Sequence, residues 1–141
     1  MTSEVNPMPA TRSFYFYRRV AGTDAVYGAC TNQIELSEDR NRLHLRLAST
    51  AKFAVTLEWR GLFHLIEALS TEMRFGVACR HETEGPVTLV VEPDGNDMTL
   101  SLRIEGSPIT VAFTPRQTTE LISHLRTGLR HIEATRPGRL L

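Results

Sequence analysis

Cations and aromatic rings alternate with apolar residues in two stretches of the first half of the chain. Arg42, His44 and Arg46 alternate with three leucines, so a strand here would send the cations to one face and the leucines to the other. A surface of this kind can bind single-stranded nucleic acid without sequence preference, because bases stack on rings and cations meet phosphates. The predicted nucleic-acid-binding residues are Tyr15, Tyr17, Arg19, Arg42, His44, Arg46 and Lys52, on the condition that the first strand turns its tyrosines to the same face.

The same pattern also fits a solvated antiparallel sheet face on which tyrosines pack across strands. The 16 basic and 16 acidic residues give a net charge of zero, which counts against a protein that coats nucleic acid by bulk charge. Any basic surface must therefore be local. Every basic residue except Lys52 is arginine, whose side chain can stack as well as pair with phosphate.

No arrangement of residues in the sequence indicates catalysis. The five histidines lack the HExxH spacing, and no serine lies in a GxSxG turn. Cys30 and Cys79 are far apart and are predicted to be small buried hydrophobes. Residues 94–97 resemble the start of a calcium loop, but the later ligands are missing, so a hairpin turn is expected. The sequence predicts a protein that is not an enzyme and has no cofactor or metal.

Alternation with a period of two predicts four strands in the first half. They are residues 13–20, a run that follows the turn at 22–24 and ends at 34–36, residues 43–47, and residues 53–57 after a turn at Ser49 and Thr50. Lys52 is then expected on the fourth strand. The period changes at Trp59, and an amphipathic helix is predicted from there to about Arg74, with Leu62, Leu65, Ile66, Leu69 and Met73 on its apolar face.

The second half repeats this order. Strands are predicted at 74–80, 87–91, 100–104 and 109–113, with a turn at 93–97. Thr114 and Gln117 form a capping box, with Pro115 at the first position of a helix that continues to about Ala134. Val111 aligns with Val55, Leu121 with Leu65 and Arg116 with Arg60, without a gap. The sequence thus predicts an α+β fold of two tandem ββββα repeats, antiparallel sheets packed with two helices.

The predicted organisation is a flexible segment at 1–12, a single domain at 13–135 made of repeats 13–75 and 76–135, and a tail at 136–141. Exposed edges of four-stranded sheets favour a homodimer or higher oligomer. No stretch approaches the roughly 20 apolar residues that cross a bilayer, so no membrane partner and a cytoplasmic location are expected.

The order of elements resembles the Whirly family and the related PUR-repeat proteins, which bind single-stranded DNA or RNA. The most similar stretches are 14–19, the run 89–95 that leads into 100–104, and Phe113-Thr114-Pro115 at the start of a long last helix. The resemblance implies a single-stranded nucleic-acid-binding protein, such as an accessory factor in transcription, replication or repair. The chain departs from Whirly proteins in its first hairpin, where Ala21-Gly22-Thr23-Asp24 replaces a lysine-glycine-lysine-rich sequence.

The sequence leaves three classes of function open. The first is single-stranded nucleic-acid binding, which the alternation of rings and cations favours. The second is a homo-oligomeric module that binds a protein partner, which the zero net charge favours. The third is a carrier of a small ligand held between the sheets.

Overall fold

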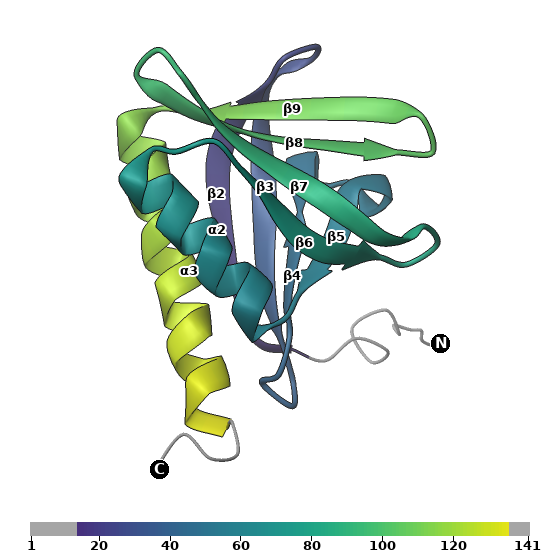
Figure 1. The fold of residues 1–141 in the computed structure, drawn as a ribbon, viewed down its shortest axis with the longest axis vertical. Helices are drawn as coiled ribbons and strands as arrows, with labels where there is room; N and C mark the ends of the chain where they lie inside the picture. The colour runs from purple at the N-terminus through teal and green to yellow at the C-terminus, as the bar shows by residue number, and fades with distance from the viewer. Residues whose placement is uncertain (1–13, 136–141) are drawn as a thin grey trace, which may run out of the picture.

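Four strands and a helix are followed along the chain by four more strands and a helix (Figure 1). The structure is a computed structural model that describes residues 14–135. The predicted flexible segment and tail lie outside these residues. The first set is β2 (Phe14–Asp24), β3 (Gly28–Ser37), β4 (Leu43–Arg46), β5 (Ala54–Leu57) and α2 (Trp59–Thr71). The second set is β6 (Phe75–His81), β7 (Gly85–Asp94), β8 (Asp97–Ile104), β9 (Ser107–Phe113) and α3 (Pro115–Thr135).

The eight strands of the described chain form one closed antiparallel sheet, not two separate sheets. Each strand pairs with the next, and β9 pairs back with β2. Two short stretches of strand pairing, which we call seams, join the two sets. In the β5–β6 seam, Val55 pairs with His81 and Thr56 with Arg80. In the β2–β9 seam, Thr23 pairs with Ala112 and Asp24 with Val111. The mixed α+β prediction is confirmed, while the prediction of separate sheets is wrong because the outer strands of the two sets pair with each other.

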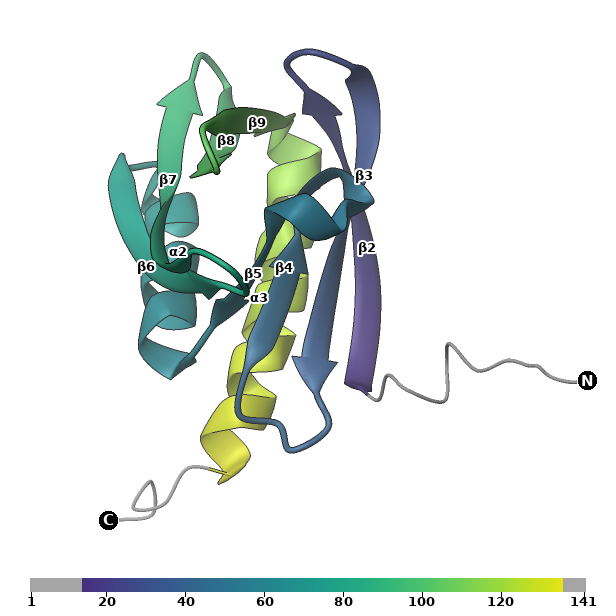
Figure 2. The same cartoon turned by 90° about the vertical axis from the view of Figure 1, so that its right-hand side faces the viewer.

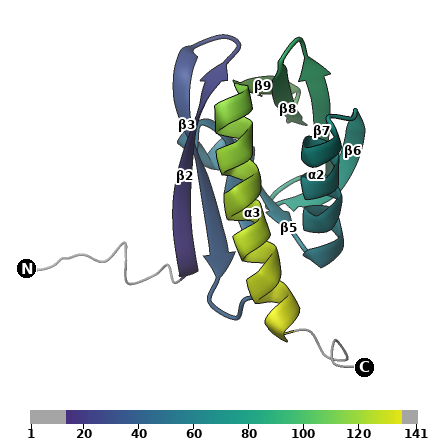
Figure 3. The same cartoon turned by 90° about the vertical axis from the view of Figure 1, so that its left-hand side faces the viewer.

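This closure removes the reason for expecting an oligomer from sheet edges. Beyond the seams, α3 packs beside β2 and α2 packs beside β6. Figure 3 shows the two helices side by side, between β2 and β3 on one flank and β6 and β7 on the other. An association of two chains must therefore depend on another surface.

The apolar side chains of the sheet and of both helices meet in one continuous core. Leu43, Leu45 and Leu47 are fully buried, as the alternation predicts, and Val55 and Val111 are buried at equivalent places in β5 and β9. Two glycines allow the helices to approach the sheet closely. An added Cβ at Gly128 in α3 would lie 2.6 Å from a methyl of Leu43, and one at Gly61 in α2 would lie 2.6 Å from the backbone carbonyl of Ala78.

Helix α3 begins as predicted, whereas α2 ends earlier. The N–H of Gln117 donates to the Thr114 hydroxyl (3.2 Å) and the N–H of Thr114 donates to the Gln117 side chain (3.0 Å), which confirms the capping box. Helix α2 stops at Thr71 because Glu72 adopts a left-handed conformation (φ 54°). Met73, predicted on the buried face, is therefore 58% exposed.

No helix in residues 14–135 combines the length and the apolar composition needed to span a membrane.

The two cysteines differ in their surroundings. Cys79 is buried, and the loss of hydration raises the pKa of its thiol to about 11. Cys30 is only partly buried, so the prediction that both are buried is wrong for this residue. Burial, and then the charge of Asp24, also raise the pKa of the Cys30 thiol.

Candidate functional site

The side chains that β2, β3, β4 and β5 turn away from the core form one continuous surface, which we call the polar face. The strand register places its residues in two rows. Arg80 of β6 extends the first row through the β5–β6 seam. The first row is Tyr17, Glu35, His44, Thr56 and Arg80, and the second is Arg19, Gln33, Arg46 and Ala54. Figure 2 shows β3, β4 and β5 in front of the helices.

A hollow of about 540 Å³ lies over this surface. Its lining includes Glu35, Arg42, His44, Arg46, Thr56 and Arg80. Its volume is within the range of roughly 300–1,000 Å³ that is typical of ligand pockets. The lining has three arginines, Arg42, Arg46 and Arg80, and three glutamates, Glu35, Glu58 and Glu82. These side chains come from both halves of the chain, so the hollow suits a polar ligand that can meet groups of both charges.

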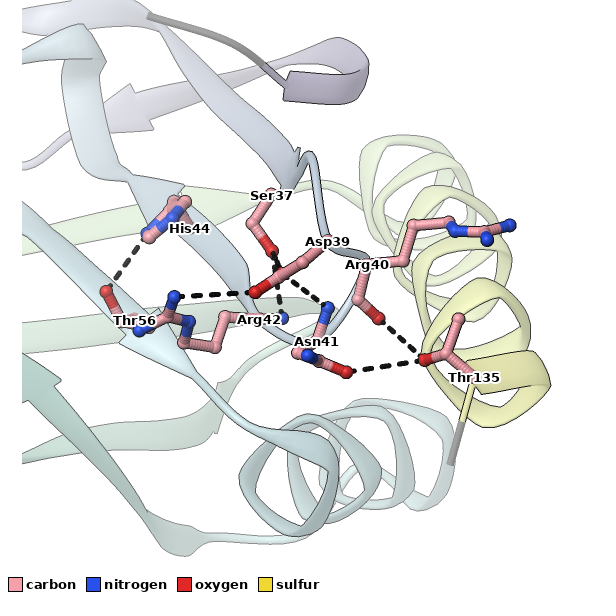
Figure 4. A network of polar contacts seen from close by, with 8 residues as sticks. All are labelled: Ser37, Asp39, Arg40, Asn41, Arg42, His44, Thr56 and Thr135. Atoms are coloured by element: carbon pink, nitrogen blue, oxygen red, sulfur yellow. Dashed lines mark hydrogen bonds and ion pairs between the residues drawn. The ribbon is translucent and has the colours of Figure 1, made fainter. Parts of the chain in front are cut away.

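Two polar residues in the centre of the polar face are held in place by neighbouring strands. The Nδ1 atom of His44 lies 3.0 Å from the Thr56 hydroxyl on the adjacent strand (Figure 4). Glu35 is 7% exposed although it belongs to this face. Its carboxylate lies between the tyrosine and histidine strands and lowers the positive charge of the row.

Arg42 lies at the edge of the hollow and is paired with an acid. Its guanidinium is 3.7 Å from the Asp39 carboxylate, and both side chains are about half exposed (Figure 4). The Ser37 hydroxyl donates to the same carboxylate (2.6 Å), as does the N–H of Asn41 (3.0 Å). These hydrogen bonds, Ser37 first, lower the pKa of Asp39. Asp39 therefore stays charged and is the ion-pair partner of Arg42.

The β3–β4 loop that holds this ion pair is anchored to the end of the last helix. The Thr135 hydroxyl lies 3.2 Å from the carbonyl of Arg40 and 3.4 Å from the side-chain oxygen of Asn41 (Figure 4). The loop thus has a fixed position relative to α3, although its sequence is polar throughout.

Tyr15 does not lie on the polar face. The pairing of β2 with β3 is irregular between Phe14 and Phe16, and this shift breaks the alternation at the start of the strand. The Tyr15 ring packs against His131 of α3 (centroids 4.8 Å apart), and the Arg40 guanidinium lies over it at 5.0 Å. The expectation that both tyrosines share a face is wrong; of the two, only Tyr17 lies on the polar face, where it pairs with Glu35 of β3.

Lys52 lies in a helical turn, so the prediction that it belongs to a strand is wrong. The turns η1 (Leu47–Ser49) and η2 (Ala51–Phe53) connect β4 to β5, and Lys52 lies in η2. Its Nζ donates to the Ser107 hydroxyl in the second half (2.9 Å). Its carbonyl accepts a hydrogen bond from Nε2 of His81 (2.8 Å), so this segment holds the β5–β6 seam together.

The structure therefore brings Tyr17, Arg19, His44 and Arg46 together, places Arg42 at the edge, and separates Tyr15 and Lys52 from them. Sequence reasoning missed Glu35 and Arg80. Alternation of Val77 and Cys79 already places Arg80 on the side opposite the core. The pairing of Arg80 with Thr56 across the two halves had no signal in the sequence.

Among residues 14–135, no group of three or more histidine, cysteine, aspartate or glutamate side chains could hold a metal ion. A scan of protein-family models, a search of curated proteins and a search of solved structures each gave no match to this chain.

Proposed function

We propose that the protein binds single-stranded nucleic acid on the polar face. The observation that supports this function best is the strand register, which aligns Tyr17 and Arg19 with His44 and Arg46 across β2, β3 and β4. A ring that can stack on a base thus lies on the same face as Arg19 and Arg46, which can meet phosphates, with Glu35 between Tyr17 and His44. A role as an accessory factor in transcription, replication or repair is part of the same proposal.

The local distribution of charge supports a single strand over a duplex. Arg19, Arg46 and Arg80 lie on one side of a chain whose net charge is zero. Glu35, Glu58 and Glu82 line the same hollow as Arg46 and Arg80, so the excess of positive charge on this side is small. A duplex presents two rows of phosphates and no exposed base faces, so it needs more cations and cannot use the ring of Tyr17.

Replacing both Arg42 and Arg46 with alanine is expected to weaken binding of a labelled single strand by about three- to tenfold, because two phosphate contacts are lost. The slope of log affinity against log salt should also decrease by about 0.7 for each lost contact. Fluorescence anisotropy with single- and double-stranded oligonucleotides over a salt series measures both effects. The thermal melt should change little, because neither side chain is part of the buried core.

Tyr17→Ala is the matched variant for the stacking contact. It should lower the affinity while leaving the salt slope nearly unchanged, since no charge is removed. Tyr15→Ala is the control, because the Tyr15 ring packs on α3 away from the polar face. Absence of binding to any single strand at low salt, or wild-type affinity in the arginine double variant, would refute the proposal.

Asp39→Asn is expected to raise the affinity for a single strand about two- to threefold. The amide oxygen can still accept from Ser37 and Asn41, but the charge that competes for Arg42 is gone. The same anisotropy titration at low salt measures the change. In an Arg42→Ala background the substitution should change the affinity less. An equal change there would show that Asp39 does not compete with the nucleic acid for Arg42.

At the level of the fold, we propose that the chain consists of two ββββα units arranged as in the Whirly and PUR-repeat proteins. The order of elements supports this, because four strands and a helix occur twice. Leu65 and Leu121, aligned in sequence, are both fully buried in the helices of their sets. Superposition of the two halves in an experimental structure, Val55 over Val111 and Leu65 over Leu121, is the test.

The alternative proposal is a module of the same fold that binds a protein partner and no nucleic acid. Exposed aromatic side chains on α2 and β6, Phe63 and Phe75, favour it. This alternative becomes the first choice if the anisotropy experiment shows no binding.

A further inference from the structure

Helix α2 presents a second face to solvent, opposite the one that packs on the core. Its buried residues are Gly61, Leu62, Leu65, Ile66, Ala68 and Leu69. The residues at spacing i, i+3, i+4 and i+7 on the other side are Arg60, Phe63, His64 and Glu67. A helix face turned to water is normally polar, whereas this one has an aromatic centre.

The aromatic side chains of this face form a continuous row that extends onto β6. Trp59 stacks on Phe63 (centroids 5.6 Å), Phe63 meets His64 (5.8 Å), and His64 meets Phe75 (5.3 Å). Phe63 is 38% exposed, Phe75 is 41% exposed, and Met73 beside them is 58% exposed. Contiguous exposed apolar side chains are a common feature of surfaces that bind another molecule.

A hollow lies on each side of the row. One, of about 160 Å³, is lined by residues that include His64, Met73 and Phe75. The other, of about 310 Å³, lies between the two helices, and its lining includes Phe63, Glu67 and Leu129 together with Arg126 and Arg130 of α3. These hollows can receive large side chains that project from a partner's helix.

The charges at the two ends of the row are opposite. Arg60 lies one turn before the pair Phe63 and His64, and Glu67 lies one turn after it. Neither Arg60 nor Glu67 has a hydrogen bond or ion pair of its side chain within residues 14–135. When two such helices cross antiparallel about a two-fold axis between positions 63 and 64, Arg60 faces the partner's Glu67, and Glu67 faces the partner's Arg60. The face is thus complementary to itself.

We propose that a second copy of this chain docks on this face, with α2 against α2 in antiparallel orientation. Phe63 and His64 lie at the centre of the contact and two pairs of Arg60 with Glu67 lie at its ends. This inference does not depend on nucleic-acid binding. The contact lies on α2 and Phe75, whereas the polar face is formed mainly by β2, β3, β4 and β5.

Charge reversal tests the contact directly. By sedimentation velocity over a range of about 1–100 µM, the wild type is expected to be a dimer in reversible equilibrium with monomer. Arg60→Glu and Glu67→Arg should each weaken the dimer at least about tenfold, because each places two like-charged pairs in the contact.

An equimolar mixture of the two variants should restore the dimer. In the mixed dimer one chain has acids at both positions and the other has arginines at both, so each end of the contact again joins opposite charges. Arg116→Glu, at the aligned position of α3, is the control and should leave the dimer unchanged.

Phe63→Ala is the test of the apolar centre and should also give monomer, while its circular dichroism melt shows that the chain remains folded. A wild type that is monomeric at about 100 µM would overturn the proposal, because a specific dimer should form well below this concentration. So would a dimer that neither charge reversal weakens, or two monomeric variants that do not associate when mixed.

Discussion

Replacing Asn32 with alanine is expected to lower the free energy of unfolding by about 3 kcal/mol, because a buried backbone carbonyl and a partly buried N–H lose their partner. Asn32 is fully buried in β3. Its side-chain nitrogen donates to the carbonyl of Val20 in β2 (3.1 Å), and its side-chain oxygen accepts from the N–H of Ala48 (2.8 Å). A buried polar group without a partner costs about 1–3 kcal/mol, and this substitution leaves the buried carbonyl of Val20 and the partly buried N–H of Ala48 without one.

Because of where Ala48 lies, Asn32→Ala should reduce stability by more than the loss of one hydrogen bond between two strands would. Ala48 and Ser49 both have positive φ angles (54° and 55°), a conformation that side chains other than glycine rarely adopt. The bond from Asn32 stabilises this turn, which leads from Arg46 to Lys52. Chemical denaturation measures the loss. Asn96→Ala, at an exposed turn, is the matched control and should change stability by less than about 0.5 kcal/mol. Similar losses in the two variants would show that Asn32 does not have the proposed role.

Gly61→Ala is expected to destabilise the protein by about 2 kcal/mol, although alanine favours a helix more than glycine does by about 1 kcal/mol. The added methyl would lie 2.6 Å from the carbonyl oxygen of Ala78. That oxygen belongs to the backbone of β6 and cannot turn away, so α2 must move off the sheet.

Gly128→Ala provides the contrast, because its added methyl meets the end of the Leu43 side chain and not backbone. A leucine methyl can move by a small rotation, and the gain in helix propensity offsets part of the cost. We expect the free energy of unfolding of Gly128→Ala to be within about 1 kcal/mol of the wild-type value in the same denaturation experiment. The prediction is wrong if Gly128→Ala costs as much as Gly61→Ala.

The sequence by itself determined most of the secondary structure, because alternation and helical spacing are local properties. The leucines at 43, 45 and 47 placed one strand and its buried face, and Thr114 with Gln117 placed the start of α3. The same alternation correctly placed His44 and Arg46 opposite the core. Local rules failed where the backbone leaves regular geometry. The shift at Phe14 to Phe16 moved Tyr15 to the helix side, the left-handed Glu72 ended α2 early, and the turns η1 and η2 removed Lys52 from its predicted strand.

Only the tertiary structure decided how the two sets of strands meet. Thr56 pairs with Arg80 in one seam, and Asp24 pairs with Val111 in the other. The sequence around these residues does not indicate the pairing, because the backbone groups of any exposed strand edge can bond to those of any other. Because the sheet closes, Arg80 from the second half of the chain joins the polar face. The closure also removed the edges that had suggested an oligomer, and packing against the core left the aromatic side of α2 uncovered. Burial depends on the sum of contacts from distant segments, and no local pattern contains that sum.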